Sequence, residues 1–164
     1  MSASLTVTAA DKAGRYRELL PQLAALIGSD TDAIAVMANV SAALKEAFGW
    51  HWVGFYRVEG DTLVLGPFQG PVACTRIPHG RGVCGSAWAR NETLVVADVD
   101  AFPGHIACSS LSRSEIVVPL TDCAGRVAAV LDIDSVHLAD FDDTDRASLE
   151  ALIPLFAPCL SAQG

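Results

Sequence analysis

Residues 50–68, WHWVGFYRVEGDTLVLGPF, predict two β-strands joined by a tight turn. Residues 50–58 and 62–68 are rich in aromatic and β-branched side chains, and the turn residues Glu59, Gly60 and Asp61 separate them. A hairpin pairs its two strands antiparallel, so this stretch predicts a mostly antiparallel sheet. Further strands are predicted at residues 73–77, 93–96, 115–120 and 126–134.

Helical periodicity is found on both sides of these strands. Apolar residues recur every three to four positions over residues 11–27, where Pro21 predicts a kink or an interruption. The same pattern over residues 31–48 predicts a second helix that ends at Gly49, with residues 28–30 breaking the first helix and capping the second.

Two more helices are predicted at residues 83–90 and 142–159, and the aperiodic residues 98–112 form a long loop of the kind that is usually functional or disordered. The order of elements predicts an α+β fold, in which N-terminal and C-terminal helices flank a central, mostly antiparallel sheet. We expect one domain over residues 1–164, with a flexible N-terminus at residues 1–10.

Composition excludes several classes of function. The chain has 11 basic and 19 acidic residues, a net charge of −8, and its two lysines are Lys12 and Lys45. Binding to nucleic acid or to an anionic membrane needs clustered positive charge, so neither is expected. No signal-peptide pattern or bilayer-length apolar run is present, and five cysteines without an export signal predict a reducing, cytoplasmic location.

Three cysteines, Cys74, Cys84 and Cys108, lie in or beside the irregular middle of the chain. They are interpreted either as small buried hydrophobic residues or as reactive thiols, and Cys84 at the start of a predicted helix has a position that lowers a thiol pKa. Packing is the preferred interpretation of Cys123 and Cys159. No C-x₂₋₄-C pair or H-x₃₋₅-H pair is present, so we expect no zinc site.

Acidic and aromatic side chains form a second group of candidates. On the apolar strand VAAVLDID at residues 127–134, the two-residue period places Asp132 and Asp134 on one face. They are either a solvated strand end, a metal site or a ligand site, and Glu115 at the start of another strand is either an edge charge or part of the same site. Trp52 and Tyr56 share a strand face and are either core or the wall of a ligand site.

Together these residues favour thiol chemistry on a sulfoxide. Neighbouring carboxyl groups repel each other, so at least one has a raised pKa and can give a proton to an oxygen while a thiolate attacks the sulfur. A second carboxylate can hold an ammonium group, and aromatic rings can enclose a sulfonium-like body. A loop cysteine with two possible resolving partners then predicts a sulfenic acid that condenses to a disulfide.

Longer motifs support this chemistry. They are WVGFY at 52–56, LGPFQG at 65–70, GVCG at 82–85, AFPGHIAC at 101–108, SEIVVP at 114–119 and VLDIDS at 130–135. With the spacings of the three cysteines, these motifs resemble the free methionine-(R)-sulfoxide reductases, a family of stand-alone GAF-domain enzymes. The likeness extends from Tyr16 to Phe156, nearly the whole chain.

The resemblance implies a GAF fold, a homodimer and a role for each residue. Cys108 would be the nucleophile, Cys74 the resolving cysteine, and Cys84 an alternative resolving cysteine or a helper. Glu115, Asp132 and Asp134 would hold the sulfoxide oxygen and the amino group of the free methionine-(R)-sulfoxide substrate, beside a wall of Trp52 and Tyr56. No metal or tightly bound cofactor would be needed, and thioredoxin would reduce the disulfide.

Two positions depart from the family pattern, and two other functions compete. Trp88 and Arg113 are expected to reshape the rim of the pocket; the alternative for Arg113 is that it helps keep the Cys108 thiolate charged. The alternative function is a non-catalytic GAF module that binds a small ligand or senses oxidants through its cysteines. A pure dimerisation domain, which predicts no thiol chemistry, is a third interpretation.

Overall fold

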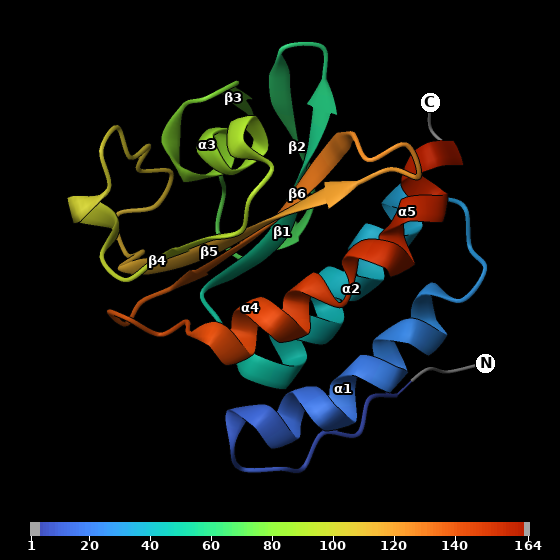
Figure 1. The fold of residues 1–164 in the computed structure, drawn as a ribbon. Helices are drawn as coiled ribbons and strands as arrows, with labels where there is room; N and C mark the ends of the chain where they lie inside the picture. The colour runs from blue at the N-terminus through green and yellow to red at the C-terminus, as the bar shows by residue number, and fades with distance from the viewer. Residues whose placement is uncertain (1–3, 163–164) are drawn as a thin grey trace.

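The computed structural model describes residues 4–162, which form an α+β fold around one antiparallel sheet (Figure 1). The strand order is β3-β2-β1-β6-β5-β4, and every neighbouring pair is antiparallel. The strands are β1 (Trp52–Glu59), β2 (Thr62–Gln69), β3 (Arg76–Pro78), β4 (Leu94–Val96), β5 (Ser114–Thr121) and β6 (Val127–Ser135). The helices are α1 (Lys12–Ile27), α2 (Ala33–Phe48), α3 (Gly82–Arg90), α4 (Asp143–Glu150) and α5 (Ile153–Ala162), with a 3₁₀ turn η1 (Val99–Ala101).

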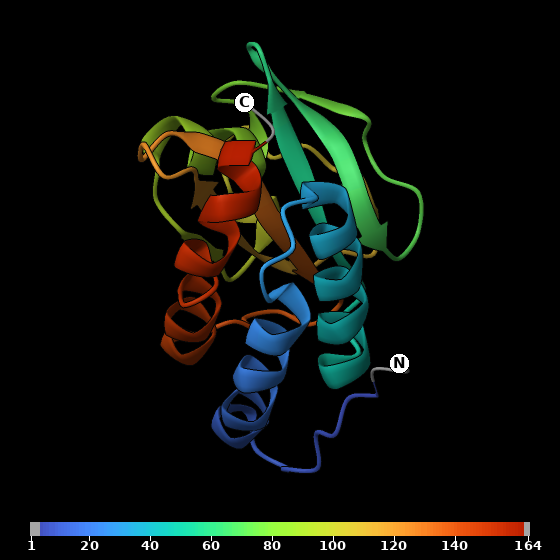
Figure 2. The same cartoon turned by 90° about the vertical axis from the view of Figure 1, so that its right-hand side faces the viewer.

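The two faces of the sheet carry different layers. Helices α2, α4 and α5 cover one face, and α1 packs mainly on these helices rather than on the strands (Figures 1 and 2). Helix α3 and the segment between β4 and β5 lie over the opposite face (Figure 1). Alternation along β6 sends Leu131 and Ile133 into the helix-covered core, whereas Asp132 and Asp134 point to the α3 side, as the two-residue period predicts.

The predicted helices are confirmed with three local differences. Helix α1 runs through Pro21 without interruption, and α2 starts at Ala33 because Asp32, rather than residues 28–30, caps it by accepting a hydrogen bond from the Ala35 N–H. The expected single closing helix is two helices. Pro154 has no N–H for the Glu150 carbonyl and its ring would clash there, so α4 ends at Glu150.

The third strand is shorter than the predicted 73–77, because β-pairing with β2 begins only at Arg76. Before it, the chain is fixed by other bonds. The Tyr56 hydroxyl donates to the Cys74 carbonyl at 2.9 Å, and the Leu65 N–H donates to the Thr75 carbonyl at 3.0 Å. The segment that carries Cys74 is therefore an anchored loop.

The N-terminal segment lies along α1. Of the residues expected to be flexible, 1–3 are outside the described part of the chain. In residues 4–10, the Thr6 N–H donates to Gln22 and the Thr8 N–H donates to Glu18, at 2.9 and 2.7 Å. Flexibility of this segment stays a prediction. Among the described residues, no helix is long and apolar enough to cross a membrane.

Candidate active site

Seven of the eight predicted site residues line one pocket on the α3 side of the sheet. The exception is Cys74, which lies just outside it. Strands β1, β5 and β6 line one side of the pocket, and the start of α3 and the segments before β3 and between β4 and β5 line the rest. The predicted residues that line it are Trp52, Tyr56, Cys84, Cys108, Glu115, Asp132 and Asp134.

Strand register brings the three carboxyl groups together. Glu115 on β5 is directly opposite Asp134 on β6, and Asp132 lies two residues earlier on the same face. Glu115 and Asp132 are each only 6% exposed, and the ion pairs found among residues 4–162 involve none of the three groups. This burial excludes a solvated strand end as the interpretation of Asp132 and a solvent-facing edge charge as the interpretation of Glu115.

Burial without a cationic partner shifts the titration of this carboxyl cluster. Burial, followed by the negative charges of Asp132 and Asp134, raises the pKa of Glu115 well above its usual range. Burial raises the pKa of Asp134 in the same direction, and it raises the pKa of Asp132 to about 6 although hydrogen bonding with Glu115 and Cys84 opposes the change. The pKa values of all three carboxyl groups are therefore raised, which is the direction that the sequence predicts for neighbouring buried acids.

Asp132 also has an oxygen without a partner. Its Oδ1 is buried and receives no hydrogen bond from residues 4–162. Leaving a buried acceptor unsatisfied costs about 1–3 kcal/mol. An acceptor in this state, in a pocket, is ready for a donor on a ligand.

Cys84 lies beside the carboxyl groups, and the pKa of its thiol shifts in the opposite direction to the prediction. It is buried near the start of α3, and burial together with the charges of Asp132, Glu115 and Asp134 raises the pKa of its thiol. The predicted lowering by the helix terminus is wrong, because burial and three acidic neighbours outweigh the partial charge of a short helix. Cys84 is therefore a neutral thiol that can donate a hydrogen bond.

Potential ligand atoms of Cys84, Glu115 and Asp132 lie within 4.8 Å of one another. These residues are 31 and 17 positions apart along the chain, so a search for short metal-binding spacings could not find the group. The absence of a metal requirement stays a prediction.

The structure contains a disulfide between Cys74 and Cys108, with 5.4 Å between the two Cα atoms. This is the pair that the resemblance implied. Cys108 lies on the long segment between β4 and β5 and lines the pocket. Cys84 remains a free thiol. Cys123 is exposed in the turn between β5 and β6, so its predicted packing role is wrong. Cys159 is buried in the helix-covered core, where its thiol donates to the Phe156 carbonyl, in agreement with a packing role.

An aromatic wall closes one side of the pocket. The ring of Trp52 stacks on Tyr56 and on Phe68, with centroid distances of 5.9 and 5.2 Å. The Trp52 indole N–H donates to the Pro71 carbonyl at 3.1 Å, which fixes the ring. A Cβ at Gly54 would lie 2.6 Å from this ring and 2.3 Å from Phe68, so only glycine allows the wall to pack this closely.

Sequence reasoning missed several residues near the nucleophile. His105, Ser109 and Ser112 line the pocket, and the motif at residues 101–108 was the only signal for the first of them. The His51 ring nitrogen Nε2 and the Ser109 hydroxyl are 3.1 Å apart, and their hydrogen bond holds the Cys108 segment to the start of β1. Trp88 and Arg113, expected at the rim, are not among the lining residues, and Trp88 instead packs edge-on against His79.

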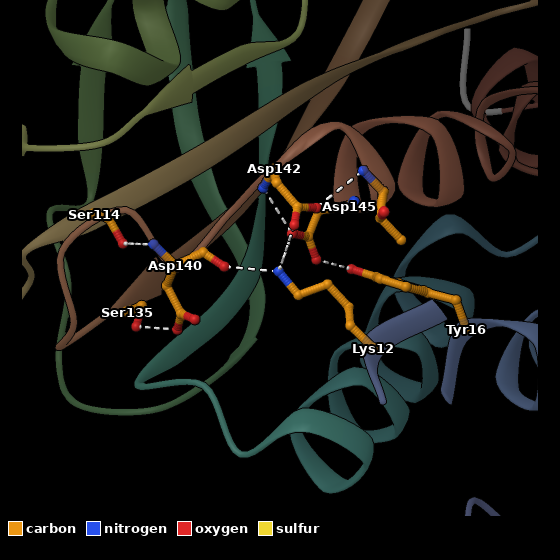
Figure 3. A network of polar contacts seen from close by, with 8 residues as sticks. Lys12, Tyr16, Ser114, Ser135, Asp140, Asp142 and Asp145 are labelled. Carbon is orange, nitrogen blue, oxygen red and sulfur yellow. Dashed lines mark hydrogen bonds and ion pairs between the residues drawn. The ribbon is translucent and has the colours of Figure 1, made fainter. Parts of the chain in front are cut away.

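A polar network anchors the sheet end that carries the carboxyl pair (Figure 3). Ser114 and Ser135 are the register neighbours of Glu115 and Asp134, on the opposite face. The Ser135 hydroxyl donates to Asp140, and the Ser114 hydroxyl donates to the His137 carbonyl.

The same network continues into the helices. Lys12 donates to the Asp140 carbonyl at 2.8 Å and to the buried Asp145 at 2.6 Å, and the Tyr16 hydroxyl donates to Asp145 at 2.6 Å (Figure 3). These bonds connect α1 and the start of α4 to the ends of β5 and β6. The network lies on the face of the sheet opposite to the carboxyl groups and supports the pairing of Glu115 with Asp134.

An antiparallel sheet with helices on one face and a thiol–carboxyl pocket on the other defines the class of protein, and comparison with known proteins agrees. Residues 30–161 match the family described as GAF domain. The GAF domain-containing protein A of Dictyostelium discoideum is 52% identical over 94% of this chain and 98% of its own. The free methionine-R-sulfoxide reductase of Escherichia coli is 49% identical over 84% of each chain.

A solved structure extends the likeness to three dimensions. The free methionine-R-sulfoxide reductase from Neisseria meningitidis, in complex with its substrate, is 58% identical, covers 98% of this chain and 97% of its own, and has a TM-score of 0.94. The chain belongs to the GAF-domain family and, within it, to the free methionine-(R)-sulfoxide reductases.

Proposed function

We propose that this chain is an enzyme that reduces free L-methionine-(R)-sulfoxide to L-methionine. The observation that carries the proposal is the position of Cys108, which lines a pocket with three carboxyl groups and is bonded to a second cysteine just outside it. A module that only binds a ligand needs no such pair. The names of the relatives from Escherichia coli and Neisseria meningitidis support the choice of substrate.

The charges in the pocket match the groups of the substrate. The sulfoxide oxygen accepts hydrogen bonds and a proton, and Glu115, whose pKa is raised by burial, and the thiol of Cys84 are the donors that we assign to it. The substrate ammonium group is a donor, and it satisfies the unpartnered Oδ1 of Asp132. Trp52 and Tyr56 provide an apolar wall for the S-methyl end.

The cycle then follows from the thiol chemistry. The Cys108 thiolate attacks the sulfoxide sulfur, the oxygen takes a proton from Glu115, and methionine leaves while the oxygen passes to Cys108 as a sulfenic acid. The Cys74 thiol attacks this sulfenic acid, water leaves, and the Cys74–Cys108 disulfide forms. Methionine sulfoxide is reduced by two electrons, and the two thiols are oxidised by two.

The disulfide must be reduced before the next turnover, and we assign this step to thioredoxin as the external dithiol. A reductant of this kind and five cysteines in one chain fit a cytoplasmic enzyme that acts in oxidative stress repair. We further propose that it works as a homodimer and needs no metal or bound cofactor.

NADPH consumption in the presence of thioredoxin and thioredoxin reductase tests the proposal. The substrates are free methionine-(R)-sulfoxide, the (S) epimer and a peptide-bound sulfoxide. We expect turnover of the free (R) epimer alone, and its loss in Cys108→Ser. A folded, reduced protein that is inactive with every substrate would overturn the proposal in favour of a GAF module that binds a ligand or senses oxidants.

A further inference from the structure

We propose that the exposed surface around the Cys74–Cys108 disulfide is the docking surface of a protein dithiol, and that the dithiol attacks the sulfur of Cys74. We call this surface the disulfide face and define it as the exposed residues within 70–81 and 107–113. The inference rests on the proposed function, because a cycle that ends in a disulfide requires a reductant that can reach it.

Two large apolar side chains are exposed on the disulfide face. Val72, two residues before Cys74, lines the pocket yet is 88% exposed, and Leu111, three residues after Cys108, is 61% exposed. The disulfide brings the two segments together, with 5.4 Å between the cysteine Cα atoms. Leu111 lies between Ser109 and Ser112, which line the pocket, but does not line it. Exposed apolar side chains at a point where a partner must approach are typical of an interaction surface.

The charge of the disulfide face is opposite to that of the molecule. The chain has a net charge of −8, yet residues 62–91 and 101–114 contain no aspartate or glutamate. Arg76 and Arg113 are both exposed there. An apolar centre with cationic side chains around it fits a partner whose own contact surface is apolar and acidic, and opposite charges steer such partners together.

The position of the disulfide relative to the pocket indicates whether the sulfur of Cys74 or that of Cys108 is attacked. Cys108 faces the pocket, whereas Cys74 does not line it and belongs to the anchored loop before β3. Both cysteines are half-buried, and Cys74 is the one of the two that lies outside the pocket, so we assign the attack of an incoming thiolate to Cys74. The incoming thiolate forms a mixed disulfide with Cys74, the Cys74–Cys108 bond breaks, and Cys108 leaves as a thiolate into the pocket. The second thiol of the dithiol then releases Cys74, so that the partner is oxidised by two electrons and this chain is reduced by two.

The first test measures the rate at which thioredoxin, the probe, reduces the disulfide form in the absence of sulfoxide. We expect Leu111→Asp to slow this reaction about tenfold or more, as the loss of a central apolar contact does. The matched control is Ile34→Asp on α2, which changes a side chain of similar exposure, 56%, on the helix-covered side of the sheet. Dithiothreitol, which needs no docking surface, should reduce both variants at the wild-type rate.

Charge reversal adds an independent readout. Arg113→Glu should slow reduction by thioredoxin and weaken its dependence on ionic strength, whereas Arg17→Glu, at an exposed position on α1, should do neither. Thioredoxin that retains only its attacking cysteine should be trapped in a mixed disulfide with Cys74, identified by mass spectrometry of the linked peptides.

A mixed disulfide on Cys108, or a wild-type rate of reduction in Leu111→Asp, would overturn the inference. A change in the molar mass of Leu111→Asp by light scattering would also overturn it, since the disulfide face would then be covered by a second copy of the chain. Failure of the proposed function gives a different result: thioredoxin would reduce the disulfide normally, but the reduced protein would not convert methionine sulfoxide.

Discussion

Asp132→Asn should make the protein more stable near neutral pH and less active. The substitution keeps the shape of the side chain but removes a charge that is buried without a cationic partner. Burial raises the pKa of Asp132 from 3.8 to about 6. A rise of this size corresponds to about 3 kcal/mol of cost to the ionised form in the folded state. This is an upper limit to the gain, because the new amide must also find hydrogen-bond partners.

The pH dependence identifies the cause. The folded-state pKa of Asp132 is above its unfolded value, so the folded state binds more protons than the unfolded state. The stability that comes from protonating Asp132 is fully present only below pH 3.8. That stability is lost as the pH rises through about 6. Asp132→Asn has no such loss, so its free energy of unfolding should exceed that of the wild type at pH 7.5 and approach it at pH 3.5.

Urea unfolding of the disulfide form at both pH values measures this difference. Turnover of free methionine-(R)-sulfoxide should fall in the same variant, mainly through KM, because the substrate ammonium group loses its charged partner. A variant that is less stable than the wild type at pH 7.5, or a stability difference that does not change with pH, would show that the ionised Asp132 does not destabilise the fold.

Three further substitutions test other parts of the site and its support. Glu115→Gln keeps hydrogen bonding but cannot transfer a proton, so single-turnover release of methionine should slow about 10²–10⁴-fold at unchanged fold; a wild-type rate would remove Glu115 as the acid. Gly54→Ala places a Cβ against the Trp52 ring and Phe68, and should cost about 1–3 kcal/mol of stability in urea unfolding. Tyr16→Phe leaves the buried Asp145 without its hydroxyl donor and should cost a similar 1–3 kcal/mol; a smaller loss would mean that water replaces the hydroxyl.

The parts of the site that sequence could predict are those set by local periodicity. The alternation along β6 placed Asp132 and Asp134 on one face and Leu131 and Ile133 on the other, because successive side chains of a strand point to opposite faces of the sheet. Trp52 and Tyr56 were placed together on β1 for the same reason. The motifs added the pairing of Cys74 with Cys108, which no local pattern contains.

The remaining features depend on contacts between distant segments. The register that sets Glu115 opposite Asp134 is fixed by the pairing of β5 with β6 and by the Ser114 and Ser135 bonds behind it. The direction of the Cys84 pKa shift depends on burial and on carboxyl groups 31 or more residues away. The prediction considered only the position of Cys84 at the start of a helix, and it was therefore wrong. Residues 73–75 have the composition of a strand, but apart from one backbone bond between Leu65 and Thr75 they are held by a tyrosine hydroxyl and a disulfide.

In the proposed cycle, Cys108 reduces the sulfoxide and Cys74 then resolves the product. This cycle is tested most directly by a single turnover of the fully reduced protein with free methionine-(R)-sulfoxide and no external reductant. We predict one methionine released per chain, loss of two free thiols, and a Cys74–Cys108 disulfide in the peptide map. In Cys74→Ser, methionine should still be released and a sulfenic acid should be trapped on Cys108 by dimedone. Release of methionine by Cys108→Ser, or no release by the folded and reduced wild type, would contradict the account.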